Sequence, residues 1–155
     1  YQAGVQQVIL NGENVTSLLR TEETGKMASK TSKYAAVRTK LVALQRGLAK
    51  KTDVIMDGRD IGTTVLPDAF AKIYLTASSD ARAKRRYDEL KEKGENRSFD
   101  AIKEDIEKRD YEDMHRAISP LKQADDAVLV DTSDMNIEQV VAVLSKIIDE
   151  KKAGR

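Results

Sequence analysis

The sequence predicts an α/β protein with a parallel sheet, because short apolar runs alternate along the chain with longer amphipathic segments. Three runs have the composition of strands, at residues 54–56, 71–77 and 127–130. The run 54–56 ends at a turn that contains glycine, which is typical of a buried parallel strand. Helices are expected from about Ser79, over 99–116 and over 137–148.

The first third of the chain has a different pattern. Residues 8–10 indicate a short strand entering a tight Asn-Gly turn at 11–12, and Val15 and Thr16 are expected to open the partner strand of a hairpin. From about residue 24 to 51 the pattern is helical, with one apolar stripe: Val37, Leu41, Leu44 and Leu48. Ser32 precedes this stripe and is expected to cap it, which favours two helices over one.

The composition excludes several classes of function. The 155 residues include 27 Lys and Arg against 26 Asp and Glu, so the net charge of +1 gives no long-range attraction to nucleic acid or to an anionic membrane. There is no cysteine, which excludes disulfides and thiolate metal sites. No apolar stretch approaches the roughly 18 residues of a membrane span. We expect a cytoplasmic protein without nucleic-acid or membrane partners.

The segment 57–62 directly follows the first predicted strand of the sheet. Ligands of parallel sheets bind beyond the carboxyl ends of the strands. Arg59 can grip a phosphate through two parallel hydrogen bonds. The flanking Asp57 and Asp60 can hold Mg²⁺ through water or accept a hydrogen bond from an exocyclic amine, and the two glycines allow a sharp turn. The alternative is a polar turn with a local ion pair.

One face of the predicted helix 99–116 changes character along its length. It begins with three apolar residues at helical spacing: Phe99, Ile102 and Ile106. The same spacing continues to Arg109, Asp113 and Arg116, and arginines that face a core need a partner or an anion. Asp113 can pair with either arginine. The pattern predicts a phosphate-binding cleft, or alternatively an ion-paired surface that emerges into solvent.

A third group of basic residues follows Ser79. It consists of Arg82, Arg85 and Arg86, of which the first and last share a helix face. By itself such a cluster indicates only a solvated surface. His115 is the only histidine, and nothing in the spacing places it in a catalytic triad or a metal site.

Several of these segments together resemble bacterial cytidylate kinases. Residues 57–69 are similar to the signature D-G-R-D-x-G-T-x-V-x-P-x-A. The stretch Lys108-Arg109-Asp110 with Arg116-Ala117-x-x-Pro120-Leu121 resembles the segment that joins the lid to the core. Asn11-Gly12-Glu13-x-Val15 and Arg20-Thr21-x-Glu23 resemble the extra hairpin region. The similarity runs from about residue 8 to 148.

The resemblance implies a P-loop kinase-like parallel sheet, incomplete at its N-terminal part, with a small α+β monophosphate-binding insertion and a helical lid. It divides the chain into a monophosphate-binding region at 1–51, an α/β core at 52–79 and 117–155, and a lid with flanking helices at 80–116.

The reaction implied is transfer of the ATP γ-phosphate to CMP or dCMP with Mg²⁺. The resemblance assigns cytosine recognition to Ser29, Arg38 and Asp60, and a ribose contact to Asp113. Arg59 is expected to bind the CMP phosphate, with Arg109 and Arg116 near the point of transfer. Arg82, Arg85 and Arg86 are expected in or near the lid over ATP, and Asp57 is expected to hold Mg²⁺ through water.

The family also has a phosphate-binding loop of the form G-x-x-x-x-G-K-[ST]. Thr24-Gly25-Lys26 does not complete this pattern. The pattern would need Gly at position 20 and Ser or Thr at position 27, where the chain has Arg20 and Met27. We therefore expect the chain to be the larger, C-terminal part of such a kinase, inactive alone, which associates with the missing segment or another copy. Two alternatives are a kinase for UMP or AMP, and a non-catalytic α/β module that uses Arg109, Asp113 and Arg116 in protein contacts.

Overall fold

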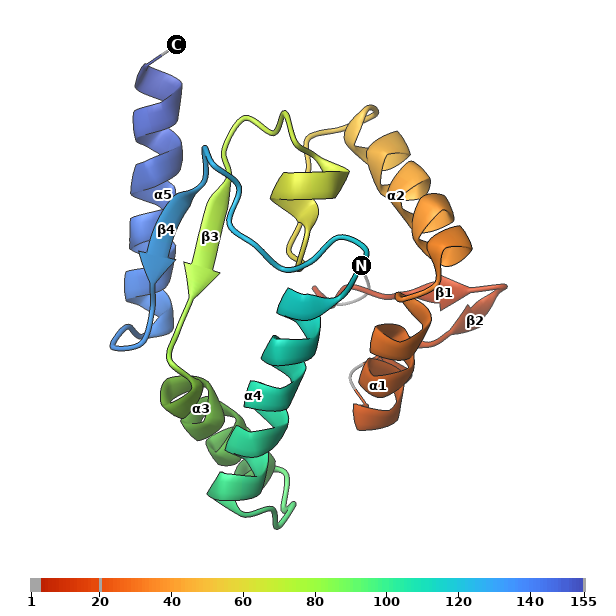
Figure 1. The fold of residues 1–155 in the computed structure, drawn as a ribbon, viewed down its shortest axis with the longest axis vertical. Helices are drawn as coiled ribbons and strands as arrows, with labels where there is room; N and C mark the ends of the chain where they lie inside the picture. The colour runs from red at the N-terminus through yellow and green to blue at the C-terminus, as the bar shows by residue number, and fades with distance from the viewer. Residues whose placement is uncertain (1–3, 20, 155) are drawn as a thin grey trace. The chain divides into compact units, whose positions relative to one another are not determined.

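A computed structural model describes residues 4–19 and 21–154 of the chain (Figure 1). Arg20, which belongs to the hairpin-region resemblance, lies outside the described residues. The chain divides into two compact units, Tyr1–Gly47 and Leu48–Arg155. Within the described ranges, no helix has both the length and the apolar character needed to cross a membrane.

The first unit begins with the predicted hairpin. Strands β1 (Ile9–Leu10) and β2 (Glu13–Asn14) pair antiparallel. Both turn residues have positive φ, 51° at Asn11 and 88° at Gly12, which is the conformation that a two-residue hairpin turn requires. The Asn-Gly pair therefore determines this turn.

The partner strand lies two residues earlier than expected. A two-residue turn sets Glu13 opposite Leu10, so β2 ends before Val15. The Val15 N–H still donates to the Val8 carbonyl at 2.9 Å, but Thr16 already begins η1, a short 3₁₀ turn (Thr16–Leu18). The prediction that Val15 and Thr16 open the second strand was wrong.

Two helices follow, as predicted: α1 (Glu22–Thr31) and α2 (Ala35–Ala49). The role expected for Ser32 was wrong, because it ends α1 instead of starting α2. Its backbone is helical (φ −64°, ψ −13°), its N–H donates to the Ala28 carbonyl at 3.0 Å and its hydroxyl to the Ser29 carbonyl at 2.9 Å. An N-cap needs an extended backbone, which Thr21 supplies for α1.

The second unit contains a two-stranded parallel sheet of β3 (Ile73–Thr76) and β4 (Val128–Asp131). Both strands were predicted. The strand expected at 54–56 is absent, because in the described part of the chain no strand forms a ladder with it. Instead of being buried, Ile55 is fully exposed.

A pair of helices carries the core of the second unit. Helices α3 (Ser79–Glu92) and α4 (Phe99–His115) begin where the sequence predicts them, and Ser78 and Ser98 accept hydrogen bonds from their first turns. The two helices pack side by side (Figure 1) around three buried residues: Ala83, Leu90 and Ile102. Tyr87 and Phe99 close this core in an edge-to-face contact, with ring centroids 6.5 Å apart. The last helix, α5 (Ile137–Ala153), begins with a capping box between Asn136 and Gln139.

Ile102→Ala should lower the free energy of unfolding by about 2–4 kcal/mol, because Ile102 is 2% exposed and its loss leaves a cavity between α3 and α4. Urea denaturation of the protein, followed by the circular dichroism signal of its helices, measures the change. Ile137→Ala is the matched control, since Ile137 is 80% exposed and should change stability by less than about 0.5 kcal/mol. Equal effects of the two substitutions would contradict the packing described.

Candidate functional site

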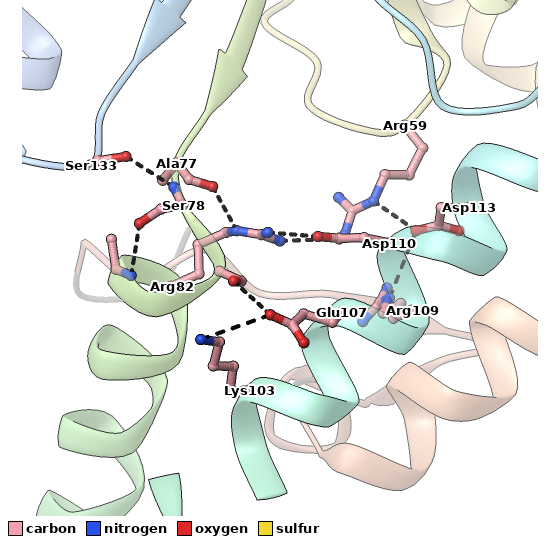
Figure 2. A network of polar contacts seen from close by, with 12 residues as sticks. Arg59, Ala77, Ser78, Arg82, Lys103, Glu107, Arg109, Asp110, Asp113 and Ser133 are labelled. Carbon is pink, nitrogen blue, oxygen red and sulfur yellow. Dashed lines mark hydrogen bonds and ion pairs between the residues drawn. The ribbon is translucent and has the colours of Figure 1, made fainter. Parts of the chain in front are cut away.

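Asp113 lies near the C-terminal end of α4 and is 8% exposed. Its Oδ2 accepts a hydrogen bond from Arg59 Nε at 3.0 Å, and Arg109 Nε lies 3.9 Å from the same oxygen (Figure 2). Its Oδ1 lies 3.8 Å from Arg116 Nη1. One buried carboxylate is therefore shared by three guanidinium groups, which confirms the predicted pairing with Arg109 and Arg116 and adds Arg59.

Arg116 is the most buried of these arginines, with a side chain 13% exposed. It is the C-cap of α4, where the backbone becomes extended (ψ 142°) and turns the side chain back toward the helix end. Its Nε donates to the Ser119 carbonyl at 2.5 Å, and Ser119 itself has a φ of 50°. Arg116 Nη2 is buried and makes no hydrogen bond, lying 3.7 Å from Asp60 Oδ1. A buried guanidinium nitrogen with an unused N–H group is suited to donate a hydrogen bond to an anionic oxygen.

Asp60 is positioned by the turn that follows it. Its carbonyl accepts the N–H groups of Thr64 (2.8 Å) and Val65 (3.2 Å), which forms η2 (Ile61–Val65), a single π-helical turn. Val65 is 2% exposed and anchors this turn. Turns of this kind are rare in proteins, but those that occur often lie at functional sites.

Gly58 and Gly62 contribute close packing and not a left-handed turn. Neither has a positive φ. A Cβ at Gly58 would lie 2.9 Å from Ile61 Cγ1, and one at Gly62 would lie 3.3 Å from Lys72 Cδ. The glycines therefore let η2 fold back on its own loop and on the start of β3.

Lys72, just before β3, joins the loop after η2 to Asp126, just before β4. Its side chain is 9% exposed, and its ammonium donates to the Pro67 carbonyl and pairs with Asp126 at 2.6 Å. The hydrogen bond from Lys72 lowers the pKa of Asp126 below the ordinary value of 3.8. Lys72 was not predicted to support the site, since nothing in its spacing marks it.

The structure thus brings together five of the predicted site residues: Arg59, Asp60, Arg109, Asp113 and Arg116. Three arginines against two aspartates leave a local excess of one positive charge, which favours an anion. Ser29 lies on α1 and Arg38 on α2, both half-buried in the first unit. Their part in the same site stays a prediction.

Asp57 is exposed at the end of the 54–56 run. Among the described residues, no group of three or more His, Cys, Asp or Glu side chains could hold a metal ion. A single exposed carboxylate nevertheless fits Mg²⁺, which keeps several of its waters and takes its other ligands from phosphates.

The three arginines of α3 have different partners. Arg82 pairs with Asp110 on α4, and Arg86 donates to Glu89 at 2.8 Å. Arg85 donates to the carbonyl of Thr132, in the loop after β4. Asp110 was missed as a site-related residue, although it stands in the Lys108-Arg109-Asp110 segment.

The fold and the arginine cluster define the chain as an α/β protein in which three arginines surround one buried carboxylate. The cytidylate kinase family model matches residues 1–150. The chain is 52% identical to a cytidylate kinase of Lactobacillus johnsonii over 96% of its length, 47% to one of Thermosipho melanesiensis over 92%, and 48% to one of Pseudomonas paraeruginosa over 90%. The chain belongs to the cytidylate kinase family. It spans 65%, 65% and 61% of the length of these relatives.

The contribution of the Lys72–Asp126 pair to stability should depend on pH. Because the pKa of Asp126 is lower in the folded state than in the unfolded chain, the pair stabilises the fold above about pH 4. This contribution is lost as the pH falls through the folded-state pKa. Asp126→Asn should therefore lower the melting temperature by a small, constant amount above about pH 5, and the gap should close as the pH falls through the lowered folded-state pKa of Asp126. A gap that persists at the acid end would contradict the assignment. Lys72→Met should lower the melting temperature at neutral pH by at least as much, since it also removes the hydrogen bond to the Pro67 carbonyl.

Proposed function

We propose that the full-length protein transfers the γ-phosphate of ATP to CMP or dCMP, and that this chain contributes the nucleoside-monophosphate site. The observation that carries the proposal is the buried Arg116 Nη2, which has no hydrogen bond, beside a carboxylate shared by three arginines. Family membership and the names of the relatives support the same reaction.

Arg59, Arg109 and Arg116 are the residues proposed to hold the phosphate of the monophosphate substrate. Their guanidinium groups come from a loop and from the end of a helix, and all lie within 4 Å of Asp113. A doubly charged phosphate is therefore offered donors that Asp113 already orients, which reduces the cost of ordering them at binding.

Recognition of the nucleoside is assigned to polar groups around the arginines. Asp60 can accept a hydrogen bond from the amino group of cytosine, which would disfavour uracil, since uracil has a carbonyl there. We assign Ser29 and Arg38 to the same base. Asp113 is assigned to the ribose, where it would accept a hydrogen bond from a hydroxyl group while keeping its arginines in place.

The chemistry asked of these residues is alignment and charge stabilisation. An oxygen of the CMP phosphate attacks the γ-phosphorus, the bond to the β-phosphate oxygen breaks, and ADP leaves with that electron pair. The attacking oxygen is already anionic, so no histidine base is needed. Arg109 and Arg116 stabilise the charge that spreads over the transferred group.

The remaining ligands are ATP and Mg²⁺. Mg²⁺, when bound, neutralises charge on the phosphates of ATP, and Asp57 would hold it through water. We assign Arg82, Arg85 and Arg86 to a lid of helices α3 and α4 that covers ATP and excludes water from the transfer. The setting proposed is the cytoplasm, with small-molecule substrates.

Arg59→Ala in the protein expressed from its full reading frame should lower kcat/KM for CMP by about 10²–10³-fold, because it removes one charged donor to the substrate phosphate. Lys146→Ala is the control, since Lys146 forms an exposed pair with Glu150 on α5, outside the proposed lid. A coupled assay of ADP release measures both. An unchanged kcat/KM for Arg59→Ala would remove Arg59 from the site.

A further inference from the structure

Arg82 on α3 holds Asp110 on α4 through a two-pronged contact (Figure 2). Its Nη1 donates to Asp110 Oδ1 at 3.0 Å and its Nη2 to Oδ2 at 2.6 Å. Its Nε donates to the Ala77 carbonyl at 3.0 Å, just beyond the end of β3. A single guanidinium group therefore joins the carboxyl end of the sheet to the middle of α4.

Two neighbouring contacts lie on the same face of α4. Glu107 Oε1 accepts from the Ser79 hydroxyl at 2.8 Å, and Lys103 Nζ donates to Asp80 at 2.9 Å. Residues 103, 107 and 110 follow one another at spacings of four and three, so they form one stripe along the helix. The Arg82 and Asp110 side chains are 35% and 21% exposed, against 65% for Asp80, so the two-pronged pair is screened least by solvent.

This contact lies directly beside the arginine cluster. Asp110 follows Arg109 in the chain and precedes Asp113 by about 4.5 Å along the helix axis. An α-helix is stiff over one turn, so a force that holds Asp110 also sets the direction of Asp113. Asp113 in turn holds Arg59 at 3.0 Å.

We propose that Arg82 and Asp110 are a positioning pair for the monophosphate site. The inference rests on the proposed function and adds two residues to it. The pair acts without contact to CMP: it fixes the C-terminal half of α4 against the end of β3, so that Asp113 presents its arginines in the arrangement that a phosphate needs. A small displacement of such groups lowers affinity sharply.

A positioning role differs in its consequences from a role confined to ATP. If Arg82 acted only on ATP in the lid, CMP binding measured without ATP would not depend on it. If the pair positions α4, CMP binding without ATP depends on Arg82 and on Asp110 alike, and the two dependences overlap because they report one contact.

Isothermal titration of CMP, without ATP, into the protein expressed from its full reading frame tests the proposal. Arg82→Lys keeps the charge but loses the fork, and Asp110→Asn keeps the shape but loses the charge. Each should raise the Kd for CMP about tenfold, and the double variant should also lie near tenfold and not near a hundredfold. Lys84→Ala is the matched control, since Lys84 forms an exposed pair with Asp88 on the same helix and should leave Kd unchanged.

Stoichiometry separates positioning from mere loss of folded protein. A variant that is only less stable binds fewer CMP molecules per chain with an unchanged Kd, and this outcome overturns the proposal. Unchanged Kd values for Arg82→Lys and Asp110→Asn, or effects that multiply in the double variant, overturn it as well while the proposed function stands. Absence of CMP binding by the unmodified protein overturns the proposed function itself.

Discussion

The site depends on one buried carboxylate that is shared among like charges. Three guanidinium groups gathered around one point repel one another. Each lies within 4 Å of Asp113, whose carboxylate, on a residue that is 8% exposed on α4, offsets this repulsion. The compensation is incomplete, because Arg116 Nη2 keeps an unused donor. An anion that reaches this point completes the charge balance, so the same arrangement that holds the loop to the helix leaves a place for a phosphate.

The surrounding structure determines where this carboxylate lies. The apolar half of α4 packs on α3 through Ile102, and the next turns carry the charged face without a change of direction. On the loop side, η2 holds Asp60, and Lys72 joins the loop after η2 to Asp126, just before β4. Helix packing, a π-helical turn and a lysine tether thus converge on a small polar cluster, in which each group is oriented before a ligand arrives.

Local signals predicted most of the elements. Ser78 and Ser98 mark the starts of α3 and α4, and Asn11-Gly12 marks the hairpin, because caps and turns are decided by nearby residues. The prediction of a strand at 54–56 was wrong, because a strand needs a hydrogen-bonded neighbour and an apolar run alone does not show whether one is present. Likewise, the Asp113 pairings with Arg109 and Arg116 follow from helical spacing, whereas Arg59, Lys72 and the Arg82–Asp110 contact join residues far apart in sequence.

Phosphorus NMR of CMP bound to the protein tests most directly whether the arginine cluster holds the substrate phosphate. The second pKa of a free phosphate monoester is about 6. Donors that carry positive charge favour the dianion, so the bound phosphate should lose its last proton at a distinctly lower pH than free CMP in the same buffer. A bound phosphate that titrates at the same pH as free CMP, or at a higher pH, would contradict the account.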